Sequence, residues 1–253
     1  MNKRPNILWL TSDQQRWDTI HASGNDYIDT PNLDKLCKEG VLFTQAYCQS
    51  PICTPSRASF LSGRYPSAVN ANINGGANLP EHCQLVSKKL ADSGYLCGLI
   101  GKLHITSALD DHEDRMDDGF SYFCYNLGPG HDLEGQSSQY AKWLREEKNI
   151  DWRSLFTNDG KHSYYWYKED APVELRQTAW CAEKAIDFIS KQDKDRPWML
   201  CVNCYDPHPP FDAPASYVQK YLARGLPDPI FSEHDIEEWE RLNRFFHQST
   251  AKP

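Results

Sequence analysis

Short apolar runs alternate with amphipathic segments along most of the chain. A short apolar run bounded by polar or turn residues is typical of a buried strand, and apolar residues three or four positions apart are typical of a helix. The alternation of the two predicts an α/β protein with a mostly parallel sheet. The patterns predict strands at residues 6–11, 41–46, 95–100 and 198–204, and helices at residues 31–39, 84–93, 173–191 and 233–247.

The first apolar run, residues 6–11, is interpreted as a central strand. It is followed by Asp13 and Gln14, which would then lie at the sheet edge where open α/β proteins bind ligands. A carboxylate there is a suitable ligand for a hard cation, although an Asp after a strand is more often a cap or turn residue. The sequence therefore makes Asp13 a candidate metal ligand.

Two later segments differ in regularity. The helix predicted at residues 173–191 carries Leu175, Ala182, Ile186 and Ile189 on one side, which predicts its buried face. Between residues 110 and 171 the regular pattern is lost, and Asp, Gly and aromatic residues dominate. We interpret residues 110–171 as a long insertion that shapes a substrate mouth within a single 1–253 unit, with aromatic side chains that stack on a ligand or pack under the loop.

Composition and charge narrow the class of protein. The chain has 253 residues, 25% charged residues and a net charge of −8, with no basic cluster, which argues against nucleic acid as a partner. A local pocket can still be positive and accept an anion. No apolar run near the start is long enough for a signal peptide or a membrane span, so a cytoplasmic protein without a membrane partner is expected. Nine cysteines, an odd number, fit a largely reduced protein.

The stretch from Cys53 to Arg57, Cys-Thr-Pro-Ser-Arg, carries the strongest candidate chemistry. Pro55 favours a helix that starts just after Cys53 and directs its free N–H groups at an anion. Arg57 lies one turn further on and offers a two-pronged positive charge for a tetrahedral oxyanion. The alternative is a buried structural cysteine before an ordinary helix.

This stretch and its continuation to Gly63-Arg64 resemble the maturation signature of the type I sulfatases. Three further motifs resemble the same family in the same order, and the likeness extends from residue 5 to about residue 211. They are Thr30-Pro-Asn-Leu-Asp-Lys-Leu36, Gly101-Lys102-Leu103-His104 and Pro207-His208-Pro-Pro-Phe211. The resemblance implies the alkaline-phosphatase-like fold and a sulfatase that acts on a sulfated alcohol, sugar or aryl compound.

The resemblance also implies a cofactor and a role for each residue. Cys53 would be converted to formylglycine by a formylglycine-generating or radical maturation enzyme. A divalent cation, most often Ca²⁺ and alternatively Mg²⁺, would be bound by Asp13, Gln14 and the modified Cys53. One oxygen of the hydrated aldehyde would attack sulfur and the alcohol would leave. The sulfated hemiacetal would then collapse, which releases sulfate and restores the aldehyde. His104 would be the base for that collapse, Lys102 and His208 would hold the sulfate, and Arg57 would steady the hydrate.

Two departures from the family pattern leave alternatives open. Many sulfatases have a second Asp where this chain has Gln14, and related phosphonate and phosphodiester hydrolases carry Asp-Gln. After His208 no further Asp-Asn or Asp-His pair of the metal site follows, so the chain looks truncated before the C-terminal part of the family. A non-catalytic sulfatase-like domain is therefore a second alternative. Such a domain would bind an anion or a partner chain, and its incomplete sheet would favour self-association.

Overall fold

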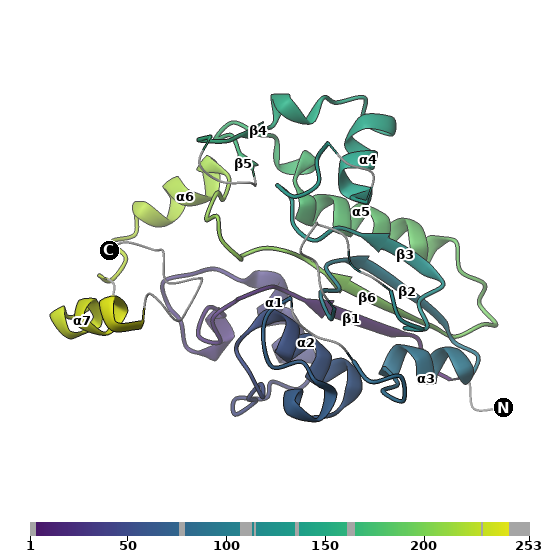
Figure 1. Ribbon diagram of the computed structural model, residues 1–253. Coiled ribbons are helices and arrows are strands. Elements are labelled where there is room, and N and C mark those ends of the chain that lie inside the picture. Colours follow the sequence, from purple (N-terminus) through teal and green to yellow (C-terminus); the bar gives the residue numbers. More distant parts are fainter. Residues whose placement is uncertain are drawn as a thin grey trace.

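The computed structural model describes residues 4–75, 79–106, 113, 115–134, 137–160, 165–228 and 230–242. Within this part of the chain, four parallel strands form one sheet in the order β1-β6-β2-β3 (Figure 1). The strands are β1 (Ile7–Thr11), β2 (Leu96–Gly101), β3 (Tyr122–Tyr125) and β6 (Trp198–Asn203). A separate antiparallel pair joins β4 (Phe156–Thr157) and β5 (Trp166–Tyr167).

Helices cover both faces of the sheet. On one face, α4 (Gln139–Glu146) and α5 (Gln177–Ser190) pack with Ile100, Leu200 and Val202. On the other, α2 (Cys53–Ser62) and α3 (Val86–Asp92) pack with residues of β2 and β6 that point the opposite way. The remaining α-helices of the described residues are α1 (Pro31–Glu39), α6 (Ala215–Leu222) and α7 (Glu233–Leu242). The predicted α/β class with a mostly parallel sheet is confirmed.

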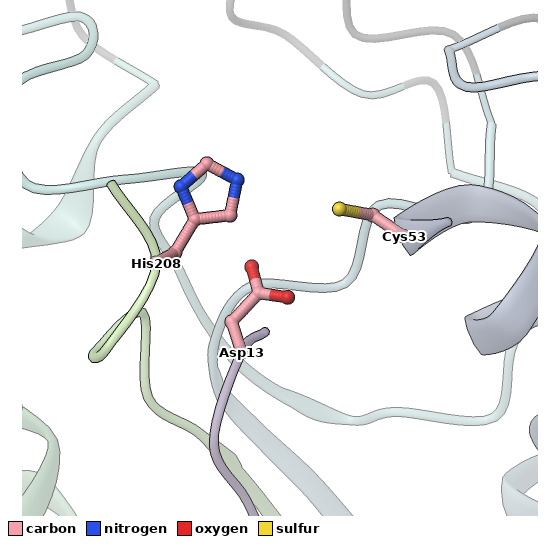
Figure 2. A group of neighbouring side chains, drawn as sticks. All are labelled: Asp13, Cys53 and His208. Carbon is pink, nitrogen blue, oxygen red and sulfur yellow. The ribbon is translucent and has the colours of Figure 1, made fainter. Parts of the chain in front are cut away.

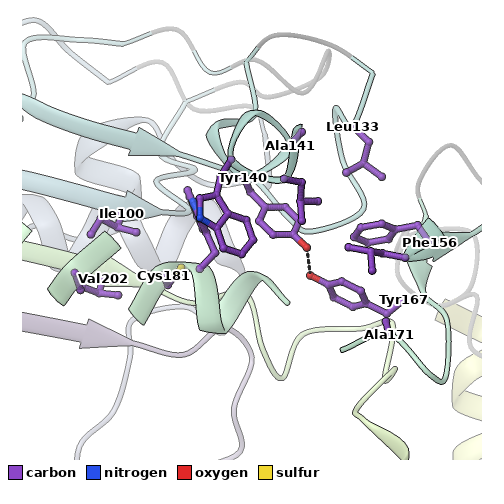
Figure 3. Packing of buried hydrophobic residues seen from close by; sticks show 14 of the residues in the cluster. Ile100, Leu133, Tyr140, Ala141, Phe156, Tyr167, Ala171, Cys181 and Val202 are labelled. Carbon is purple, nitrogen blue, oxygen red and sulfur yellow. Dashed lines mark hydrogen bonds between the residues drawn. The ribbon is translucent and has the colours of Figure 1, made fainter. Parts of the chain in front are cut away.

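The core on the α4–α5 face is largely aromatic. Tyr140, Trp143 and Trp180 are fully buried there, and the hydroxyl of Tyr140 lies 2.8 Å from that of Tyr167 (Figure 3). The Tyr140 hydroxyl also donates to the Leu175 carbonyl at 2.6 Å, so the buried phenol has polar partners. The hydrogen bond to Leu175 connects α4 to the residues just before α5, and the contact with Tyr167 connects α4 to β5.

The structure corrects the predicted place of two strands. Residues 6–11 do form β1, but within the described residues β1 pairs only with β6 and is an edge strand, not a central one. Residues 41–46 form no strand, and Val41 and Phe43 are 77% and 76% exposed. Both errors have one cause, because a short apolar run shows local preference but not which strand it pairs with.

Two further predictions about helices and loops are wrong in detail. The buried side of α5 consists of Gln177, Trp180, Cys181, Ala185 and Phe188, whereas the predicted Ile186 is 68% exposed. Residues 110–171 are also more regular than predicted, since β3 belongs to the main sheet and α4 to the core. On α5, the large aromatic side chains of Trp180 and Phe188 fill the space over the sheet, and the aliphatic Ile186 on the adjacent face of the helix stays exposed. The role of residues 110–171 at a substrate mouth stays a prediction.

Three further predicted helices correspond to helices of the structure. The helices predicted at residues 31–39 and 84–93 correspond to α1 and α3, and the helix predicted at 233–247 to α7, with residues 243–247 outside the described residues. All nine cysteines lie in the described part of the chain, and all are free. Among the described residues no helix is both long and apolar enough to cross a membrane.

Candidate active site

The candidate residues meet at the carboxyl ends of the parallel strands. Asp13 follows β1, Lys102 and His104 follow β2, and His208 follows β6, while α2 brings Cys53 and Arg57 to the same edge. Figure 2 shows Asp13, Cys53 and His208 pointing into one space. One potential ligand atom from each of these three residues lies within 4.8 Å of the other two. Segments far apart in the sequence thus build one polar cluster.

Asp13 is the buried anion of this cluster. Its Oδ2 accepts a hydrogen bond of 2.6 Å from the Lys102 ammonium, and its Oδ1 lies 3.4 Å from the Arg57 guanidinium. All three side chains are at most 6% exposed. Burial alone would raise the pKa of the Asp13 carboxyl, but the charges of Lys102 and Arg57 outweigh it and hold the pKa below its ordinary value. Asp13 is therefore ionised at neutral pH.

The backbone of Lys102 is held from two sides. Its carbonyl accepts hydrogen bonds from Arg57 at 2.8 Å and from the Asn203 amide at 2.7 Å. The Thr11 hydroxyl donates to the side-chain amide oxygen Oδ1 of Asn203 at 2.7 Å. Gly101 has a φ of 90°, and a Cβ at this position would lie 2.1 Å from the Asn203 carbonyl oxygen, so only glycine fits. The sequence analysis missed Asn203, although its place at the end of a buried strand was a usable signal.

Cys53 is the first residue of α2, and its Sγ lies 3.8 Å from the Lys102 ammonium. The predicted anion site at the start of this helix is only partly present. The Thr54 N–H donates to the Asn74 side chain at 3.1 Å, the Ser56 N–H donates to the Ile52 carbonyl, and Pro55 has no N–H. The positive charges of the cluster come instead from the side chains of Arg57 and Lys102. Asn74, which caps the start of α2 from a distant loop, was also not predicted from the sequence.

The two histidines are in different environments. His104 is buried, has a left-handed φ of 53°, and its Nδ1 has no hydrogen-bond partner among the described residues. Burial, followed by the charges of Lys102 and Arg57, lowers the pKa of the His104 imidazole to about 3. His208 is half-buried, with its Nδ1 2.7 Å from the Pro209 carbonyl, and its ring packs 4.5 Å from that of Tyr205. Burial and the charge of Lys102 also lower the pKa of His208.

Gln14 lines the same cavity as Asp13 and Cys53, and its role as a metal ligand stays a prediction. It is exposed and has a φ of 59°, and the cavity, of about 430 Å³, is also lined by Ser56 and others. The donor atoms brought together by the described residues are a carboxylate oxygen, a thiol sulfur and an imidazole nitrogen. Conversion of Cys53 would replace the sulfur with oxygen, which suits a hard cation better, but Ca²⁺ takes roughly six to eight oxygen ligands. These residues fit a divalent cation only in part.

Comparison with known proteins identifies the family. The sulfatase family model matches residues 5–238. An arylsulfatase of Clostridium perfringens is 31% identical over 254 aligned positions, which cover 94% of this chain and 50% of that protein. The chain thus spans about half the length of this relative.

Two solved structures extend the comparison. The phosphonate monoester hydrolase of Agrobacterium radiobacter is 25% identical with a TM-score of 0.70, covering 94% of this chain and 48% of that one. The structure of BT4656 in complex with its substrate D-glucosamine-2-N,6-O-disulfate is 24% identical with a TM-score of 0.62, covering 90% and 40%, and shows likeness of fold alone. These neighbours confirm the predicted alkaline-phosphatase-like fold. Because the family model covers most of its length, the chain belongs to the sulfatase family.

Proposed function

We propose that the protein hydrolyses sulfate esters with a nucleophile formed from Cys53. The observation that carries the proposal is the position of Cys53 at the start of α2, 3.8 Å from the ammonium of Lys102, which is in turn paired with buried Asp13. A converted Cys53 supplies, as its hydrate, an oxygen nucleophile beside two fixed positive charges. Charges fixed before reaction stabilise an oxyanion at little reorganisation cost.

Each neighbouring residue then has a separate role. Lys102 holds the sulfate oxygens and neutralises the charge that develops on them, while Arg57 steadies the hydrate. His208 reaches the same space from the opposite side and contacts the sulfate. His104 is the base that accepts a proton from the modified side chain, and such proton transfers contribute about 10²–10⁴-fold to rates. A divalent cation would be held by Asp13, by the oxygen of modified Cys53 and, if its amide turns inward, by Gln14. The cation would polarise the ester.

The substrate class is a sulfated alcohol, sugar or aryl compound. A glycan is supported by the fold neighbour whose substrate is a disulfated glucosamine, and residues 110–171 remain the predicted source of selectivity. A second function, hydrolysis of phosphonate or phosphodiester bonds, is favoured by Gln14 and by the phosphonate hydrolase neighbour. The protein's partner in maturation would be the enzyme that oxidises Cys53.

The test is to produce the protein together with a formylglycine-generating enzyme. We expect peptide mass spectrometry over residues 47–57 to show an aldehyde at Cys53, and the converted protein to hydrolyse an aryl sulfate faster than a phosphodiester. Cys53→Ala should abolish turnover, and Lys102→Ala and His208→Ala should each lower it strongly. Cys48→Ala is the matched control, since Cys48 lines the same cavity but lies outside the polar cluster.

Each result has a definite meaning. An unmodified thiol at Cys53 in coproduced protein would contradict the assignment of the nucleophile. Full conversion with preference for the phosphodiester would favour the second function. Full conversion without turnover of either ester would leave the non-catalytic alternative, a domain that binds an anion or a partner chain.

A further inference from the structure

A second buried carboxylate lies behind the candidate site. Glu113 is 4% exposed and belongs to the region predicted as an insertion, so the sequence analysis gave it no role. Its Oε2 accepts a hydrogen bond of 2.5 Å from the backbone N–H of His104. Its Oε1 accepts from the N–H groups of Ile105 and Thr106, the latter at 2.9 Å. One side chain thus binds three consecutive backbone amides.

These amides belong to the turn that sets the direction of His104. A left-handed φ such as the 53° of His104 is uncommon for residues other than glycine and persists where the surroundings impose it. Three N–H groups that converge on one carboxylate impose such a turn, because an ionised carboxylate accepts hydrogen bonds and donates none. Burial raises the pKa of the Glu113 carboxyl, while the three N–H bonds and the charge of Arg57 oppose that rise.

We infer that Glu113 is a positioning residue that holds His104 in its working orientation by binding the backbone of residues 104–106. The inference rests on the proposed function. Glu113 touches the backbone of His104, so it acts through that residue and takes no part in bond making itself. Its negative charge also interacts with the positive charge of Arg57, a member of the polar cluster.

The amide isostere separates positioning from general stability. In Glu113→Gln, one oxygen acceptor becomes an NH₂ donor, which must face either the His104 N–H or the pair at residues 105 and 106. At least one backbone N–H then loses its acceptor and the turn shifts. The loss of a negative charge leaves the cluster more positive, so binding of an anionic ester should not weaken. The expected signature is a low kcat with an unchanged or lower KM.

The experiment uses the full chain with converted Cys53 and an aryl sulfate. For Glu113→Gln we expect kcat to fall roughly 100-fold, as for a reacting group displaced by about 1 Å, with KM no higher than that of the wild type. Glu39→Gln is the control and should match the wild type, because Glu39 is exposed on α1. A kcat within twofold of the wild type would overturn the inference. So would a fall that only tracks the fraction of folded protein measured by circular dichroism.

A second measurement does not depend on turnover. Hydrogen–deuterium exchange of the peptide that contains residues 104–106 should be faster in Glu113→Gln than in the wild type, and unchanged in Glu39→Gln. Equal exchange in Glu113→Gln and the wild type would overturn the positioning role, even if the protein has no sulfatase activity. If the wild type is inactive but exchange is still faster in Glu113→Gln, only the proposed function is contradicted. If Glu113→Gln fails to fold, Glu113→Asp, which keeps the charge but shortens the reach, should show the same direction of change.

Discussion

Lys102 is the residue at which the charges of the candidate site converge. Its ammonium lies 2.6 Å from Asp13, 3.8 Å from the Cys53 sulfur and 5.4 Å from the centre of the Tyr205 ring. Because Lys102 is only 3% exposed, water screens its charge weakly, and the charge acts on every group in the cluster. A cation bound at Asp13 would have to compete with this ammonium. Under the proposed function, Lys102 would therefore influence the binding of the cation, the binding of the sulfate and the reactivity of residue 53.

Burial, reinforced by the charges of Lys102 and Arg57, gives His104 an effect on stability that depends on pH. The pKa of His104 is about 3 in the folded chain, against an ordinary value of 6.5, so the neutral form is favoured by folding. Stability from this group is complete above pH 6.5 and is lost as the pH falls towards 3, because the unfolded chain binds the proton first. At pH 5 the loss is about 2 kcal/mol.

His104→Asn removes this proton-binding group and keeps a residue type that tolerates a left-handed φ. We expect the free energy of unfolding, measured with urea, to fall less between pH 7 and pH 5 in His104→Asn than in the wild type. His82→Asn, a change at an exposed histidine, should keep the wild-type slope. Identical slopes in His104→Asn and wild type would show that His104 does not titrate abnormally.

At the scale of elements, the loop that carries His208 depends on the start of α5. Arg176 donates to the Asp212 carbonyl at 2.6 Å, the Tyr205 N–H donates to the Gln177 side chain at 3.2 Å, and the Thr178 hydroxyl donates to Asp206. The Arg176 guanidinium also stacks 4.5 Å from the centre of the Tyr167 ring. Both ends of the loop are therefore fixed to one helix terminus.

Arg176→Ala should release this loop. Loss of a buried hydrogen bond from a charged donor costs about 1.5–3 kcal/mol, and we expect a loss of that size in urea unfolding. Turnover by the converted protein should also fall, because His208 would no longer be held in place. Arg145→Ala, at an exposed position on α4, is the control. If Arg176→Ala leaves both stability and turnover intact, the loop is held by its other contacts.

The sequence predicted those elements whose identity depends on local pattern. The strands that carry Asp13 and Lys102, and the helix that starts at Cys53, were found because apolar runs and a proline mark their bounds. The edge position of β1 and the buried face of α5 were not found, because they depend on which segments meet in space. Asn203, Asn74 and Glu113 were missed for the same reason, since each supports a site residue from a distant part of the chain.

At the scale of the whole molecule, β1 forms an unpaired edge of the sheet within the described residues. β1 pairs only with β6 among the described residues, so the other side of this strand has free backbone groups. Ile7 and Trp9 pack against the α2–α3 core, whereas Leu8 and Leu10, on the opposite face, are 47% and 59% exposed. Parallel sheets are normally covered on both faces, and an exposed apolar edge strand is a site of association.

We therefore expect the 253-residue chain to self-associate through β1. Sedimentation velocity over a range of concentrations should show a growing fraction of dimers or larger species. Leu10→Lys should shift the chain towards the monomer, because a charge on this face opposes both strand pairing and apolar contact. Ile186→Lys is the matched control, since Ile186 is similarly exposed, at 68%, but lies on α5 away from the edge. A monomeric wild type at all concentrations, or equal association in the wild type and Leu10→Lys, would show that the edge of β1 is not the surface of association.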